Sequence, residues 1–147
     1  MSITMTEQTL FSGEQIKELI PQRSPILMVD AFYNATADEA DAGLTLKEDN
    51  LFLSDKKFTE PGLIEHIAQS ASAFAGYNAR LQGKGAPIGY IGEIKKFNLI
   101  SLPNAGDTLR THIHIVSVVG NVSLLQAETK VNDVTVCTTN MKIAIEE

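Results

Sequence analysis

The fold of this chain is decided by the stretch Pro61-Gly62-Leu63-Ile64-Glu65-His66-Ile67-Ala68-Gln69-Ser70-Ala71-Ser72-Ala73-Phe74-Ala75-Gly76-Tyr77-Asn78-Ala79-Arg80-Leu81. Its apolar residues recur at helical spacing, and the remaining faces carry mostly alanine, serine and glycine. Between Glu65 and Arg80 there is no Asp, Glu, Lys or Arg. A helix that is apolar or small on every side is surrounded by protein. At 1.5 Å per residue it spans about 30 Å, so the stretch predicts a buried central helix along which a sheet can wrap.

The sequence after the helix predicts antiparallel strands. Four stretches rich in β-branched residues are expected to form them: Pro87–Ile100, Thr108–Val119, Val122–Val131 and Val134–Ile145. Gly120-Asn121 and Asn132-Asp133, which separate the last three, are typical of tight two-residue hairpins. The second half of the chain is therefore predicted to be a meander of four strands.

The sequence before the helix predicts a short helix and one hairpin. Ser12 with Gln15 fits a capping box, and Pro21 ends the helix that follows. We expect extended structure from Pro25 toward Tyr33 and a hairpin partner over Asp41–Leu46, where polar and apolar residues alternate.

One buried helix followed by four antiparallel strands, with one or two strands before it, is an α+β layout in which a curved antiparallel sheet wraps a long central helix. This layout resembles the hotdog fold, and we expect a single such domain over residues 1–147. One sheet of this kind leaves an edge open, which hotdog proteins cover by pairing two sheets. A homodimer, or a higher oligomer of dimers, is therefore predicted.

Composition limits the classes of partner. The 147 residues are 44% hydrophobic and 20% charged, as in an ordinary globular domain, and the formal charge of -6 disfavours nucleic acid and anionic membranes. Cys137 is the single cysteine and cannot form an internal disulfide. Met1–Leu10 shows no secretory signal, and the longest run without charges, Thr111–Ala127, is too short and polar to span a bilayer. We expect a cytoplasmic protein.

Three sequence blocks carry a family resemblance. Ile20–Asp30, which reads IPQRSPILMVD, resembles the Pro-His-Arg-x-Pro-x-Leu-x-Val-Asp signature of FabZ-type 3-hydroxyacyl-(acyl carrier protein) dehydratases. Pro61–Gln69 resembles their Pro-Gly…Glu-x-x-Ala-Gln helix, and Lys95-Lys96-Phe97 followed by Gly106-Asp107 resembles their basic-basic-Phe…Gly-Asp pair. The chain is also similar to the divergent dehydratase-like proteins of aryl polyene gene clusters, which share the helix motif but vary before it.

The resemblance implies removal of water from a 3-hydroxyacyl thioester, carried on acyl carrier protein or CoA, to give a trans-2-enoyl thioester. A base takes the proton α to the thioester, an acid protonates the departing hydroxyl, and backbone donors hold the enolate-like oxygen. The family uses a His in a His-Phe-Pro-Gly motif before the helix and an acid that matches Glu65, which reaches the His from the partner subunit. Here Asn50–Glu60 contains no His, so the usual pair is incomplete.

Glu65, His66 and Gln69 are the candidate catalytic residues. Glu65 matches the family's acid, although a carboxylate near a helix N-terminus is also favoured by the helix dipole. His66 points about 100° away from Glu65 and either serves the neighbouring subunit or, as we favour, lies at the dimer interface or is hydrogen-bonded at the helix start. Gln69 lies one turn after Glu65 on the same side, where it orients the carboxylate or the thioester, or is a polar plug in the core.

Five further residues are candidates for substrate binding. The resemblance implies that the amides of Gly62 and Leu63 at the helix start hold the oxyanion. Arg23 is a candidate for a phosphate of the pantetheine arm. Lys95 and Lys96 are candidates for carrier-protein or phosphate contact, or they are charges on a solvated strand end. No glycine-rich stretch matches a phosphate-binding or dinucleotide fingerprint, so no cofactor is predicted.

Two other groups of residues are informative, a pair of histidines on one strand and three small residues on the helix. His112 and His114 alternate on one strand face, but no third His and no Cys cluster lies near them, so we expect solvated or interface histidines and no metal site. The small residues Ala68, Ser72 and Ala75 predict a tunnel for an acyl chain along the helix.

The leading hypothesis is an atypical 3-hydroxyacyl-acyl carrier protein dehydratase of fatty acid or polyene biosynthesis. Two alternatives stay open from the sequence. A thioesterase on the same fold needs only one carboxylate to activate water, and a non-catalytic subunit that pairs with an active dehydratase needs no histidine at all.

Overall fold

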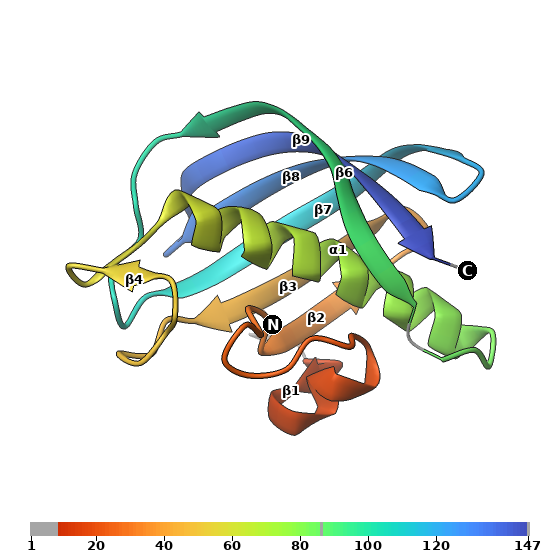
Figure 1. Ribbon diagram of the computed structural model, residues 1–147, viewed down its shortest axis with the longest axis horizontal. Helices are drawn as coiled ribbons and strands as arrows, with labels where there is room; N and C mark the ends of the chain where they lie inside the picture. The colour runs from red at the N-terminus through yellow and green to blue at the C-terminus, as the bar shows by residue number, and fades with distance from the viewer. Residues whose placement is uncertain (1–8, 86, 147) are drawn as a thin grey trace, which may run out of the picture.

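In the computed structural model, which describes residues 9–85 and 87–146, a curved antiparallel sheet wraps around one long helix (Figure 1). The helix α1 spans Glu60–Leu81, with Thr59 as its N-cap residue and Pro61 in its first turn. Every residue from 66 to 74 is buried. The prediction of a central helix surrounded by protein is therefore confirmed, and its start differs by one residue.

The main sheet has seven strands, all paired antiparallel. Their order across the sheet is β1 (Phe11–Ser12), β2 (Ala31–Ala35), β3 (Glu39–Thr45), β7 (Thr108–Val119), β8 (Val122–Val131), β9 (Val134–Glu146) and β6 (Ile88–Leu99). A small hairpin of β4 (Leu53–Ser54) and β5 (Lys57–Phe58) precedes the helix. β6 pairs only with β9, so within the described residues its other edge carries no strand.

The four predicted strands after the helix are confirmed. β7 and β8 have the predicted bounds, and β6 and β9 differ from the prediction by one residue at their ends. Hairpins at Gly120-Asn121 and Asn132-Asp133 join β7 to β8 and β8 to β9. The predicted meander is confirmed for β7, β8 and β9, each of which pairs with the next strand in sequence. It is wrong for β6, which pairs with β9 and not with β7, because a strand pattern does not show which edge of the sheet a strand joins.

The region before the helix departs from the prediction. The capping box of Ser12 and Gln15 is present and starts η1, a 3-10 helix over Gly13–Glu18. The predicted extended run from Pro25 to Tyr33 is wrong at its start, because the amides of Ile26 and Leu27 close a turn on a carbonyl three to four residues back. The strand β2 begins only at Ala31. Its partner β3 starts two residues before the predicted Asp41.

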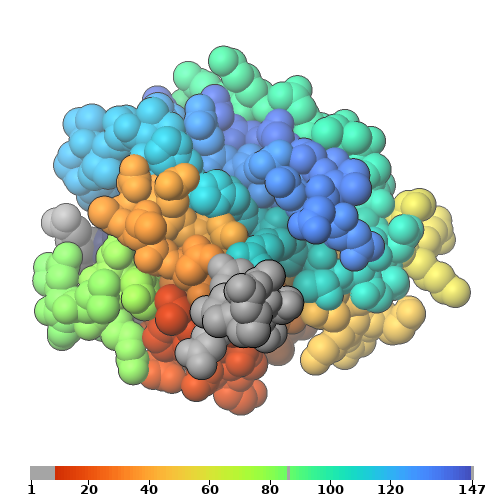
Figure 2. All heavy atoms as spheres, turned by 180° about the vertical axis from the view of Figure 1, so that it is seen from behind, coloured from red at the N-terminus to blue at the C-terminus, as the bar shows by residue number. Residues whose placement is uncertain are grey.

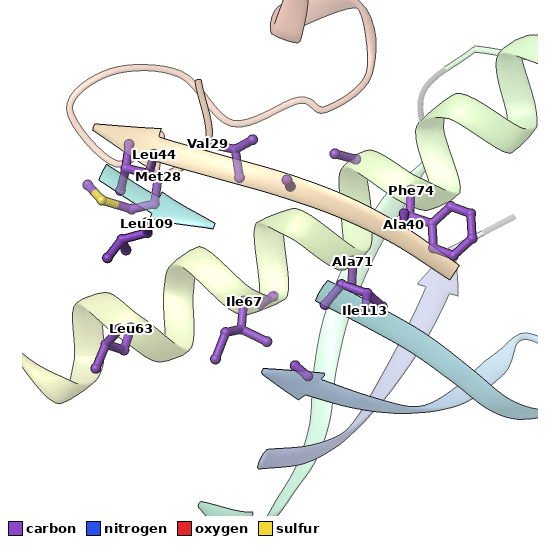
Figure 3. Packing of buried hydrophobic residues seen from close by; sticks show 14 of the residues in the cluster. Met28, Val29, Ala40, Leu44, Leu63, Ile67, Ala71, Phe74, Leu109 and Ile113 are labelled. Carbon is purple, nitrogen blue, oxygen red and sulfur yellow. The ribbon is translucent and has the colours of Figure 1, made fainter. Parts of the chain in front are cut away.

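The hydrophobic core lies between one face of α1 and the concave face of the sheet (Figure 3). The apolar side chains of this helix face recur every three or four residues and contact inward-facing residues of β3 and β7, as expected for a helix on a sheet. The labelled members on these elements are Leu63, Ile67, Ala71, Phe74, Ala40, Leu44, Leu109 and Ile113. In the part of the chain described by the structure, no helix is long and apolar enough to cross a membrane.

Candidate active site

Glu65 lies in the second turn of α1 with its side chain half-buried. Its Oε2 accepts a hydrogen bond from Nε2 of Gln69 at 2.9 Å, one helical turn away. Among the described residues, this is the hydrogen bond that holds the carboxylate, and the other oxygen, Oε1, is left available. The structure thus brings two of the three predicted catalytic residues into contact.

Gln69 is fully buried and connects α1 to the segment before β2. Its Oε1 accepts from the amide of Met28 at 2.6 Å, and its Nε2 donates to the carbonyl of Ile26 at 2.8 Å. Because a backbone N–H only donates and a carbonyl only accepts, these two contacts allow one orientation of the amide. The Nε2 group therefore faces Glu65 as a donor.

His66 points in a different direction from Glu65, toward Met28 and Thr111, as the rotation of about 100° between neighbouring helix residues predicts. It is 0% exposed within a single chain, so of the two favoured alternatives the dimer-interface histidine is wrong and the hydrogen-bonded histidine near the helix start is observed. Its Nδ1 lies 2.7 Å from the carbonyl of Met28, and its Nε2 lies 2.7 Å from Oγ1 of Thr111. Burial lowers the pKa of His66 to about 4, although the hydrogen bond to Met28 acts in the opposite direction. The ring is therefore neutral at pH 7.

The start of α1 is closely packed. The amide of Leu63 donates to the carbonyl of Thr59 at 3.0 Å, so the expectation that it holds an oxyanion is not met: the first turn of the helix already uses this donor. A Cβ on Gly62 would come within 2.6 Å of Phe52 and Phe58, whose rings pack edge to face. Gly62 is thus needed for packing at the helix start.

The three cationic candidates do not converge on Glu65. Arg23 donates to the carbonyls of Ile20 and Gln22 and, at 3.3 Å, of Lys17, which closes the C-terminal end of η1. Lys95 pairs with Glu93 at 3.4 Å, in keeping with the alternative of a charge pair on a solvated strand. Lys96 is exposed, sits in an irregular part of β6 with a φ of 52°, and lines a groove with His112 and His114.

The two strand histidines lie at outward positions of β7, on the face of the sheet that points away from the helix. Figure 2 shows the molecule from behind. His112 contacts Asp41 through Nδ1 at 2.5 Å and Glu39 through Nε2 at 2.9 Å. Partial burial opposes protonation, but hydrogen bonds to these two carboxylates outweigh it and raise the pKa of His112. His114 lies 3.6 Å from Asp38. The described residues include no group of three or more side chains suited to hold a metal ion.

A cavity of about 1150 Å³ lies between the C-terminal half of α1 and the far ends of the sheet strands. Of the three small residues predicted to make room for an acyl chain, Ala75 lines it, whereas Ala68 and Ser72 are buried outside it. Ala75 is ten residues beyond Glu65, about 15 Å along the helix. Of the three residues on which the predicted tunnel was based, Ala75 alone therefore lines this cavity, which lies beside the second half of the helix.

The placement of the histidines decides what this chain can contribute to catalysis. The sequence contains three histidines, and the structure describes all of them. His66 is buried on another side of α1, and His112 and His114 lie across the sheet from the helix. No described contact therefore joins a histidine of this chain to Glu65, and each ring is held by other partners.

Sequence reasoning missed two residues around His66. Thr111 and Thr129 are 0% exposed and face the helix from β7 and β8. Their signal was a polar residue at an inward position, for example Thr111 between the buried Leu109 and Ile113. Alternation by two shows that Thr111 points inward, but it does not show which helix residue meets it.

The comparison with protein families is decisive. The model of the ApeP-like family, described as ApeP dehydratase, matches residues 14–145. This chain belongs to the ApeP-like dehydratase family. The sequence is also 26% identical to the 3-hydroxyacyl-[acyl-carrier-protein] dehydratase FabZ of Lactiplantibacillus plantarum, over 93% of this chain and 95% of the relative. The corresponding enzyme of Vibrio atlanticus is 28% identical, with 97% and 98% covered. The chain is therefore a 3-hydroxyacyl-(acyl carrier protein) dehydratase-like protein.

Solved structures confirm the fold. A chain of the dehydratase heterocomplex ApeI:P from Xenorhabdus doucetiae superposes on this ApeP-like chain with a TM-score of 0.84 at 12% identity, covering 90% of this chain and 91% of the other. A hypothetical thioesterase with coenzyme A from Streptococcus pneumoniae gives a TM-score of 0.62 at 8% identity, with 78% and 84% covered. Both similarities extend over most of the chain and confirm the predicted hotdog fold.

Proposed function

We propose that this ApeP-like chain is the carboxylate-bearing subunit of a 3-hydroxyacyl-thioester dehydratase, in which Glu65 acts together with a histidine of a different protein. The observation that carries the proposal is the contrast between Glu65 and the histidines. Glu65 is held by Gln69 with one oxygen available, while His66 is buried on other partners and His112 and His114 lie on the outer face of the sheet.

The reaction needs two groups that move protons. The Cα–H bond and the C3–O bond break, a Cα=C3 double bond forms, and water leaves, so no oxidant or reductant is consumed. We assign Glu65 to the hydroxyl end, where it starts the step as a carboxylic acid with its proton on Oε1, gives this proton to the departing hydroxyl and becomes a carboxylate. The imidazole of the second protein takes the proton α to the thioester. Gln69 holds the carboxylate in place during both steps.

A second copy of this chain is a poor source of the missing imidazole. It would bring another buried His66 and another His112 and His114 on the outer face of its sheet. The name of the solved dehydratase heterocomplex ApeI:P supports a partner of a different sequence. The homodimer expected from the sequence stays a prediction that the same experiments address.

The unpaired edge of β6 offers the partner a place to bind. This strand has twelve residues, about 40 Å of unpaired backbone, and such edges add a strand from another chain. The exposed apolar residues Ile88, Tyr90, Ile91 and Ile94 lie along it. We propose that the two sheets join here and that the substrate is carried on acyl carrier protein, as the names of the curated relatives state for them.

The test compares the purified chain alone with its complex with a co-expressed, histidine-bearing hotdog dehydratase subunit from the same organism. Both are incubated with 3-hydroxyacyl and enoyl thioesters on CoA and on carrier protein, and intact mass and free thiol are measured. The matched control is Glu60→Gln, which removes an exposed carboxylate from the first turn of the same helix.

The proposal predicts that the thioester loses or gains water only in the presence of the complex. This turnover should disappear in the Glu65→Gln complex and remain in the Glu60→Gln complex. Release of free thiol would instead establish a thioesterase. Turnover by the chain alone would contradict the need for a second protein, and an active complex that tolerates Glu65→Gln would show a non-catalytic subunit.

A further inference from the structure

A buried chain of hydrogen bonds starts at His66 and crosses the core. Nε2 of His66 lies 2.7 Å from Oγ1 of Thr111 on β7, and this oxygen lies 2.7 Å from Oγ1 of Thr129 on β8. Cys137 on β9 is the register partner of Thr129 in the sheet. All four residues are 0% exposed. Polar groups at this depth are costly to bury, so their complete pairing indicates a defined arrangement.

The donor and the acceptor in each hydrogen bond from Met28 through His66 to Thr129 follow from the first acceptor, the carbonyl of Met28. The carbonyl of Met28 only accepts, so Nδ1 of His66 carries the proton. In a neutral ring Nε2 then accepts, which makes Thr111 the donor to His66 and Thr129 the donor to Thr111. The structure therefore assigns one tautomer, with the proton on Nδ1.

No charged group takes part in these contacts. The ring meets a carbonyl from the segment before β2 and a hydroxyl from β7, and this hydroxyl meets a second hydroxyl on β8. Burial lowers the pKa of His66 and also raises that of Cys137, so both groups stay neutral near pH 7. A buried neutral ring without access to solvent exchanges no proton with a substrate.

The same carbonyl connects His66 to the site. Met28 is held at both of its backbone polar groups by α1, since its amide donates to Gln69 and its carbonyl accepts from His66. Gln69 in turn donates to Glu65 and to the carbonyl of Ile26. If Met28 moves, Oε1 of Gln69 loses the amide that donates to it. The side chain of Gln69 is then no longer fixed, and it no longer orients Glu65.

We infer that His66 is a positioning residue: as a neutral Nδ1–H imidazole it fixes Met28 against α1 and, through Met28 and Gln69, orients the carboxylate of Glu65. This inference rests on the proposed function and extends it to a residue that touches no substrate. It also assigns a use to the histidine next to Glu65 that differs from acid or base catalysis.

Two substitutions separate positioning from proton transfer. His66→Asn keeps an N–H donor near the position of Nδ1 and has no group that titrates near neutral pH. His66→Leu has similar bulk and no donor. In the active complex, we expect His66→Asn to keep kcat within about threefold of the wild type with an unchanged pH profile, and His66→Leu to lower kcat about tenfold with KM little changed.

The activity results have clear alternatives. If His66→Asn abolishes turnover as fully as Glu65→Gln does, His66 transfers protons and the inference is overturned. Full activity of His66→Leu would also overturn it, because the donor to Met28 would then be dispensable. An inactive wild-type complex would count against the proposed function, and the inference is then decided by measurements that need no turnover.

Those measurements use the full chain. Nitrogen NMR of the His66 ring should show an Nδ1–H tautomer that persists well below pH 6, and hydrogen exchange should show a protected Met28 amide that becomes faster in His66→Leu and not in His66→Asn. An Nε2–H tautomer, a charged ring at pH 6 or equal protection of Met28 in both variants would refute the inference.

Discussion

Thr111→Val tests the buried hydrogen-bond chain with almost no change of shape. Valine replaces the hydroxyl by a methyl group, so Nε2 of His66 loses its donor and the hydroxyl of Thr129 loses its acceptor. Both atoms are buried, and each buried polar group left without a partner costs about 1 to 3 kcal/mol. We therefore expect the free energy of unfolding to fall by about 2 to 6 kcal/mol.

The assay is urea unfolding followed by circular dichroism, with the slope against denaturant compared between variants. Thr108→Val is the matched control, because Thr108 lies on the same strand and its hydroxyl pairs with Thr45 at an exposed position. We expect this control to change stability by less than about 0.5 kcal/mol.

A double-mutant cycle with His66→Leu completes the test. In the His66→Leu background there is no Nε2 atom to be left without a donor, so Thr111→Val affects one buried group fewer. The loss of unfolding free energy caused by Thr111→Val should therefore be smaller there by about 1 to 3 kcal/mol. Equal costs in the two backgrounds, or a Thr111→Val protein as stable as the Thr108→Val control, would refute the reasoning that these hydroxyls are paired through His66.

Two more predictions concern stability. Because the pKa of His66 is lowered from 6.5 to about 4 in the folded state, the unfolded chain binds its proton first as the pH falls. Stability should therefore decrease by about 3 kcal/mol between pH 6.5 and pH 4, a loss that urea titrations should find reduced in His66→Leu. A Cβ at position 76 would lie 1.9 Å from the carbonyl oxygen of Leu19. Gly76→Ala should therefore lower the melting temperature strongly or prevent folding, whereas Gly85→Ala, which meets nothing within 4 Å, should unfold like the wild type.

The candidate site shows where sequence reasoning succeeds. Glu65 and Gln69 were predicted to lie on one side of a helix one turn apart, and their side chains are in contact. This prediction depends only on helix geometry, which is local and regular. The rotation of His66 away from Glu65 follows from the same geometry.

The partners of these side chains were not predictable in the same way. The segment around Met28 reads as a strand because Ile26, Leu27, Met28 and Val29 are apolar. In the structure its backbone is bound by Gln69 and His66, and the strand begins later. A hydrophobic pattern shows that a segment is buried, but it does not show whether a strand or a helix side chain satisfies its backbone.

The sequence by itself determined the buried helix, the four strands that follow it and the family, because helical spacing, β-branched runs and hairpin residues act between neighbours in the chain. Only the tertiary structure decided that His66 is buried against Thr111, that Thr111 in turn meets Thr129, and that no described contact joins a histidine to Glu65. The physical reason is that these facts depend on contacts between residues 18 to 45 positions apart or on the face of the sheet that a side chain meets. Such contacts form only when the sheet closes around the helix.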